Sequence, residues 1–175
     1  KRASYHMGLE HIVPMEDFLQ RMTYALRART DPDFLIIGRT DAFSAVEGSR
    51  EEGVRRGQAL KELGVDLVFY RGVRQREDLA YFRKAVPDIP LFVIAGTENI
   101  SVEEYKDLGY QFIIYPITPI VATVSALMET YTALRDTGVP SIDGNVLAEK
   151  RKLVEELIGL PEYYQVEAET TERTN

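Results

Sequence analysis

The chain contains no cysteine, so neither a disulfide framework nor thiolate chemistry is available to it. No apolar run approaches the ~18 residues of a membrane span, and no signal-peptide pattern opens the chain. Basic tracts are also missing. With 28 acidic residues against 21 basic ones and a net charge of -7, nucleic acid is not expected as the main partner. These absences predict a cytoplasmic protein that binds neither a membrane nor nucleic acid.

The 175 residues, 45% of them hydrophobic, suffice for one domain with a sizeable core. Four short apolar runs are continuous rather than alternating, as in strands buried on both faces. They are expected to form strands over residues 34–38, 67–70, 91–95 and 112–115. Because the chain begins with Lys1 and not with Met, we expect further residues upstream.

Helical stretches with capping signals lie between these runs. Ser49 precedes a helix that should end at Gly64, and Ser101 precedes one that should end at Gly109. Strands that alternate with helices predict a parallel α/β architecture. Further helices are expected over residues 14–29, 119–138 and 146–160, and the polar tail 167–175 is expected to fray.

Two architectures fit four parallel strands, a small doubly wound sheet and a segment of a (β/α)8 barrel. In both, ligands gather at the carboxyl ends of the strands. Polar residues follow all four predicted strands, which favours a binding site at this edge of the sheet. The residues concerned are Arg39, Asp41, Arg71, Thr97, Glu98 and Thr118.

Arg39 carries the planar guanidinium that suits a carboxylate or phosphate group of a substrate. An alternative is a structural salt-bridge network in which Arg39 pairs with Asp41 or Glu98. The opening segment holds both histidines of the chain, His6 and His11, and could form a mobile lid. A metal site is not indicated, since no cluster of Asp, Glu and His has ligand spacing. Phosphate loops of the G-x-G-x-x-G kind are absent as well.

The stretch "DPDFLIIGRTDAF" resembles the isocitrate lyase/phosphoenolpyruvate mutase superfamily, in particular its methylisocitrate lyase and oxaloacetate decarboxylase branches. The likeness continues in order through "ALKELGVDLVFYRG", "IPLFVIAGTE", "LGYQFIIYPIT" and "EYYQVE". It implies a (β/α)8 TIM-type barrel of which this chain supplies roughly strands five to eight and the C-terminal helices. Residues 1–175 would then be part of a single domain, with 1–15 as the mobile active-site loop. Residues 145–165 would be a helix exchanged between subunits of a homo-oligomer, a dimer or tetramer.

The resemblance also implies roles for single residues. Lys1, Ser4 and His6 fall in the catalytic loop, and Glu98 joins them as a catalytic residue. The substrate-binding positions would be Arg39 for the carboxylate, with Arg71, Thr97 and Thr118. The family binds Mg2+, and its metal-binding carboxylates would lie upstream of this chain.

Two departures from the family pattern bear on the activity. The loop cysteine is replaced by Ala3 or Ser4, which cannot serve as the same acid or base. Arg71 stands where the family often has glutamate. We therefore expect a Mg2+-dependent lyase, mutase or decarboxylase for a small α-keto or α-hydroxy carboxylic acid, acting through an enolate-like intermediate. Isocitrate or methylisocitrate cleavage is not expected. The alternative is a diverged, non-catalytic binding or structural subunit. A receiver-like signalling domain fits less well, because Thr118 stands where such a domain needs lysine.

Overall fold

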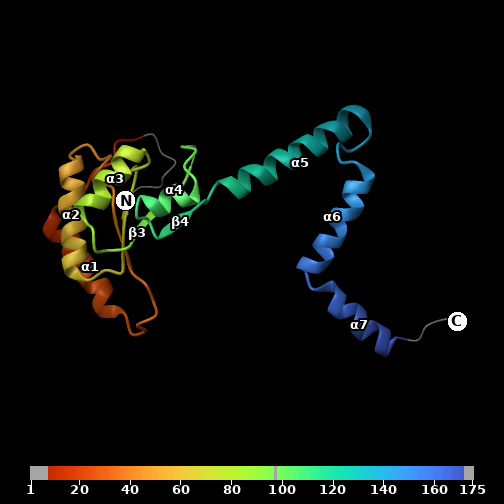
Figure 1. The fold of residues 1–175 in the computed structure, drawn as a ribbon, viewed down its shortest axis with the longest axis horizontal. Coiled ribbons are helices and arrows are strands. Elements are labelled where there is room, and N and C mark those ends of the chain that lie inside the picture. The colour runs from red at the N-terminus through yellow and green to blue at the C-terminus, as the bar shows by residue number, and fades with distance from the viewer. Residues whose placement is uncertain (1–7, 97, 172–175) are drawn as a thin grey trace. The chain divides into compact units, whose positions relative to one another are not determined.

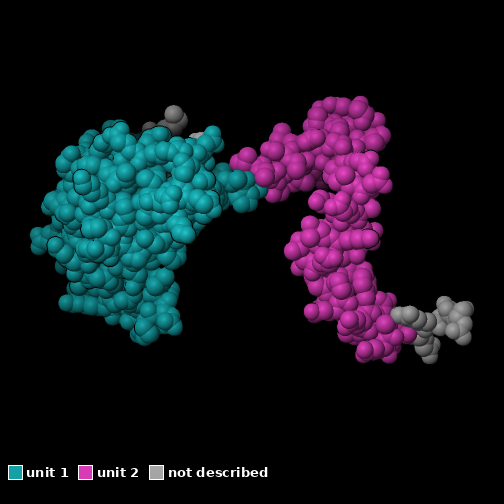
Figure 2. All heavy atoms as spheres, in the orientation of Figure 1, with its two compact units in different colours: residues 1–119 teal, residues 120–175 magenta. Residues whose placement is uncertain are grey.

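The computed structural model describes residues 8–96 and 98–171. The chain divides into two compact units, residues 1–119 and residues 120–175 (Figure 2). The prediction that residues 1–175 form part of one domain concerns a complete barrel, and it stays a prediction.

The first unit is built on a parallel four-stranded sheet in which the strands follow one another in chain order (Figure 1). This confirms the predicted parallel α/β architecture, and the described residues form an open sheet rather than a closed barrel. The strands are β1 (Ile37–Thr40), β2 (Leu67–Tyr70), β3 (Leu91–Ile94) and β4 (Phe112–Ile114).

Helices alternate with these strands, and their ends follow the capping signals in the sequence. The Ser49 hydroxyl accepts a hydrogen bond from the Glu52 amide, and Gly64 ends that helix in the left-handed conformation with φ 89°. Ser101 and Glu104 form a reciprocal capping box. The helices of this unit are α1 (Met15–Ala28), α2 (Arg50–Leu63), α3 (Arg76–Ala85) and α4 (Val102–Asp107). The N-cap of α3 makes no side-chain hydrogen bond, so α3 lacks the signal that marks α2 and α4 in the sequence.

The core lies between the sheet and the helices. Leu60 on α2 is fully buried and contacts β1 so closely that a Cβ atom on Gly38 would lie 2.8 Å from its Cδ2. Leu79 and Phe82 on α3 are fully buried as well. On β3, buried and half-buried residues alternate, and β4 has no buried residue. The predicted burial on both faces therefore holds for β2 alone among the four strands.

The remaining helices confirm most of the C-terminal prediction. They are α5 (Thr118–Thr137), α6 (Gly144–Leu157) and α7 (Leu160–Thr170). Asp143 caps α6 by accepting a hydrogen bond from the Asn145 amide at 2.9 Å. The prediction that the tail 167–175 frays is wrong for residues 167–170, which belong to α7. None of the helices in residues 8–96 and 98–171 is long and apolar enough to cross a membrane.

Candidate active site

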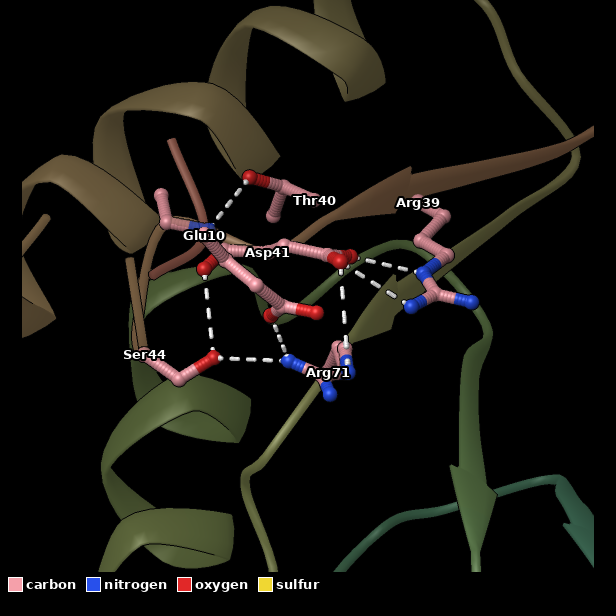
Figure 3. A network of polar contacts seen from close by, with 7 residues as sticks. Glu10, Arg39, Thr40, Asp41, Ser44 and Arg71 are labelled. Atoms are coloured by element: carbon pink, nitrogen blue, oxygen red, sulfur yellow. Dashed lines mark hydrogen bonds and ion pairs between the residues drawn. The ribbon is translucent and has the colours of Figure 1, made fainter. Parts of the chain in front are cut away.

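The carboxyl ends of β1 and β2 bring polar side chains from distant parts of the chain together. Thr40 pairs in register with Tyr70, so the residues that follow each strand, Asp41 and Arg71, are neighbours. The Arg71 amide donates to the Thr40 carbonyl at 3.0 Å and holds this register. Figure 3 shows the resulting group of side chains.

Arg39 lies inside β1, whereas the sequence placed it just after a strand ending at residue 38. Its guanidinium stacks over the Phe69 ring on β2, 5.3 Å from the ring centroid. Nε donates to Asp41 Oδ1 at 2.6 Å and Nη2 donates to Asp41 Oδ2 at 3.0 Å. The structural pair of Arg39 and Asp41, considered from the sequence, is therefore present. No pair of Arg39 with Glu98 occurs among the described residues.

Arg71 faces two carboxylates at once. Its Nη1 donates to the Glu10 carboxylate and to the Ser44 hydroxyl, the latter at 3.3 Å. Its Nε lies 3.9 Å from Asp41 Oδ2. We call Glu10, Arg39, Asp41 and Arg71 the rim cluster. Two cations and two anions alternate in it, so its formal charge is zero (Figure 3).

The N-terminal segment, residues 8–14, is attached to this end of the sheet by further contacts. The Glu10 carbonyl accepts from the Val46 amide at 2.9 Å, and the Val13 carbonyl accepts from Arg56 Nη2 at 2.6 Å. His11 contacts Glu47, and this hydrogen bond lowers the pKa of the Glu47 carboxyl below its ordinary value. Residues 8–14 are therefore fixed against this end of the sheet and form a wall of the site.

A cleft of about 440 Å³ lies between the N-terminal segment, α1 and the end of β1, with Glu10, Arg39 and Asp41 in its wall. Arg56 also lines it, although its side chain is only 4% exposed. Arg56 Nε donates to Glu52 Oε1 at 2.7 Å. Hydrogen bonds from Arg55 and then Arg56 lower the pKa of the Glu52 carboxyl. The cleft is thus lined by three arginines, Arg21, Arg39 and Arg56. Arg39 and Arg56 already have carboxylate partners, Asp41 and Glu52.

Sequence reasoning did not identify Arg56 or Glu10 as site residues. An arginine within a helical pattern gives no sign of burial, and its contact with Val13 joins residues 43 positions apart. The other three residues of the rim cluster, Arg39, Asp41 and Arg71, follow apolar runs in the sequence, and this position was the signal for them.

The other predicted site residues are less connected. Glu98 is mostly buried, with Oε1 3.7 Å from Arg74 Nη1 and with Oε2 lacking a hydrogen bond within the described part of the chain. Thr118 is the exposed first residue of α5. The structure thus joins Arg39 and Arg71 through Asp41. That Glu98 and Thr118 belong to the same site at this edge of the sheet stays a prediction. Lys1, Ser4, His6 and Thr97 lie outside the described residues.

The residues of the site do not fit a metal ion. Within residues 8–96 and 98–171, no three His, Asp or Glu side chains are grouped so that they could hold one. The two carboxylates of the rim cluster, Glu10 and Asp41, each contact an arginine. Their negative charge is already compensated, which leaves little attraction for a divalent cation.

Comparison with known proteins shows the family. The sequence pattern of phosphoenolpyruvate phosphomutase matches residues 4–135. The chain is 31% identical over 167 residues to 2,3-dimethylmalate lyase of Eubacterium barkeri, covering 93% of this chain and 56% of that enzyme. It is 30% identical over 140 residues to oxaloacetate decarboxylase of Rhodopseudomonas palustris, covering 78% of this chain and 47% of that enzyme. The chain thus spans about half the length of the curated relatives it matches.

A solved structure extends the likeness to three dimensions. Oxaloacetate acetylhydrolase in complex with the inhibitor 3,3-difluorooxalacetate superimposes with a TM-score of 0.76 at 26% identity. The match covers 100% of this chain and 59% of that one. With the sequence match over residues 4–135, the conclusion is that this chain belongs to the phosphoenolpyruvate phosphomutase family.

Proposed function

We propose that this protein is an enzyme that forms or breaks a carbon–carbon or phosphorus–carbon bond in a small α-keto or α-hydroxy carboxylic acid. The observation that carries the proposal is the geometry of Arg39. Its two donors hold both oxygens of one carboxylate, that of Asp41, at 2.6 and 3.0 Å beside the cleft. A guanidinium arranged in this way can bind a substrate carboxylate in the same two-point manner.

The names of the relatives support this substrate class. One is a 2,3-dimethylmalate lyase, one an oxaloacetate decarboxylase and one an oxaloacetate acetylhydrolase bound to 3,3-difluorooxalacetate. Malates and oxaloacetates are small hydroxy and keto dicarboxylic acids. A carboxylate-binding arginine at the end of β1 and a cleft of about 440 Å³ suit a ligand of this size and charge.

Mg2+ and an enolate-like intermediate are part of the proposal because the resemblance implies them. The described residues offer no place for the ion, so its ligands would come from outside them. The contribution that we assign to this chain is to bind and orient the substrate carboxylate. Arg39 supplies the two donors, and the Phe69 ring beneath it limits the movement of the guanidinium.

Calorimetry with oxalate tests the proposal on the whole protein. Oxalate is planar like an enolate, so a site built for that state should bind it in the presence of Mg2+. Succinate carries the same charge but is not planar, and it should bind more weakly. Methylisocitrate should not be cleaved, because the loop lacks the cysteine. The absence of Mg2+-dependent oxalate binding would contradict the proposed activity.

One observation favours the non-catalytic alternative. Arg39 and Arg71 both have protein carboxylates as partners, so the rim cluster satisfies its own charges without a ligand. A purely structural cluster of this kind would hold the strand ends together in a binding or structural subunit. The oxalate experiment separates the enzyme from a purely structural subunit, since a structural cluster would leave oxalate unbound.

We also propose that the protein is a homo-oligomer, a dimer or a tetramer built from two dimers, through an exchanged segment at residues 145–165. The structure divides this segment, predicted as one helix, between α6 and α7. Leu157 and Ile158 at the end of α6 are 77% and 63% exposed, and Tyr163 on α7 is 69% exposed. Apolar side chains grouped on the surface favour burial against a partner. Light scattering on the whole protein should therefore give a mass of at least two subunits. Leu157→Lys should shift the mass towards the monomer, whereas Lys152→Gln, elsewhere on α6, should not. A monomer mass for the unchanged protein would contradict the assembly.

A further inference from the structure

We propose that Arg71 is a positioning residue. It donates a hydrogen bond to the Asp41 carboxylate when a substrate carboxylate occupies Arg39, and it anchors the N-terminal segment through Glu10. The inference rests on the proposed function, because it takes the ligand of Arg39 to be a carboxylate. It differs from the role that the resemblance implies for Arg71, which is direct contact with the substrate.

Asp41 stands between two guanidinium groups. Its Oδ2 lies 3.0 Å from Arg39 Nη2 and 3.9 Å from Arg71 Nε. Asp41 already occupies the Nε and Nη2 donors of Arg39. A substrate carboxylate that binds these same donors must therefore displace Asp41.

The displaced carboxylate needs another cation. The Asp41 side chain is 17% exposed, and an unpaired charge that is largely withdrawn from water is costly. Arg71 Nε needs an approach of only ~1 Å to reach ordinary hydrogen-bond distance. Arg71 therefore lowers the cost of freeing Arg39 for the substrate, without touching the substrate itself.

Arg71 can hold both carboxylates at once. Its Nη1 is used by Glu10 and Ser44, whereas Nε faces Asp41, and a guanidinium has five N–H donors. Glu10 lines the cleft, and its backbone carbonyl accepts from the Val46 amide. Arg71 consequently fixes the cleft wall and the alternative position of Asp41 from a single point (Figure 3).

The transfer of the Asp41 carboxylate from Arg39 to Arg71 is tested by a double-mutant cycle on the whole protein, with oxalate as the probe and Mg2+ present. Arg71→Gln alone should raise the Kd about tenfold, because Asp41 then competes for Arg39 without another cation. In the Asp41→Asn background there is no charged competitor, so Arg71→Gln should change the Kd by less than about twofold. Arg76→Gln is the matched control. Arg76 pairs with Glu104, outside the rim cluster, and its removal should leave the Kd unchanged.

The outcomes separate this role from the others. An equal loss of affinity in both backgrounds would mean that Arg71 contacts oxalate or acts through its charge alone, and it would overturn the transfer. No loss in either background would overturn it as well. If the unchanged protein binds no oxalate, the proposed function fails and the transfer of Asp41 fails with it.

Hydrogen exchange tests the anchoring role without any ligand. The Val46 amide donates to the Glu10 carbonyl, so release of Glu10 should expose it. Arg71→Gln should therefore speed exchange of the Val46 amide in the ligand-free protein, whereas Arg76→Gln should not. Unchanged exchange in Arg71→Gln would overturn the anchoring role, whatever the result with oxalate.

Discussion

Replacement of Arg39 with lysine is expected to weaken Mg2+-dependent oxalate binding by the whole protein by about 1–3 kcal/mol. Lysine keeps the positive charge but loses the planar pair of donors that now holds both oxygens of Asp41. It also loses the stacking of the guanidinium over the Phe69 ring, whose centroid lies 5.3 Å from Cζ. The loss should appear in calorimetry as a smaller binding constant with unchanged stoichiometry.

Arg76→Lys is the matched control for this change. Arg76 also uses two donors toward one carboxylate oxygen of Glu104, but it lies outside the rim cluster. Its replacement should leave oxalate binding as it was. Binding that is indifferent to Arg39→Lys would show that Arg39 is not the carboxylate ligand, and the non-catalytic role would then be the better account.

Gly57→Ala is expected to lower the free energy of unfolding by about 3 kcal/mol or more. A Cβ atom at Gly57 on α2 would lie 1.6 Å from the Tyr70 hydroxyl oxygen and 2.6 Å from its Cζ. The Tyr70 ring cannot move aside easily, because it is buried and packs on Phe82 with centroids 4.2 Å apart. Either α2 or β2 must shift, and β2 precedes Arg71 in the rim cluster.

Urea denaturation of the whole protein measures this effect. Gly144→Ala is the control, since no atom lies within 4 Å of a Cβ placed there. It should be neutral or slightly stabilising, as expected for alanine in a helix. Adding Tyr70→Phe to Gly57→Ala removes the closest atom, a buried hydroxyl without a partner among the described residues, and should recover part of the loss. If Gly57→Ala is as stable as Gly144→Ala, the close packing of α2 on β2 is wrong.

The strands show how far local pattern reaches. The apolar run at 67–70 coincides with β2, but the run predicted over 34–38 only overlaps β1 (Ile37–Thr40). Phe34 and Leu35 precede the strand and are 66% and 50% exposed. An apolar run indicates that a segment is hydrophobic, whereas its bounds depend on the partner strand, here through the pairing of Ile37 with Leu67.

From its sequence alone, this protein could be recognised as a parallel α/β chain with Arg39 at a strand end. Caps, glycine stops and apolar runs are local, so they can be read along the chain. The partners of the arginines were decided by the tertiary structure. Arg71 meets Glu10 across 61 positions, and Arg56 meets Val13 across 43. Such contacts form because the parallel register and the packing of α2 bring distant residues to one edge of the sheet, and no local pattern encodes that approach.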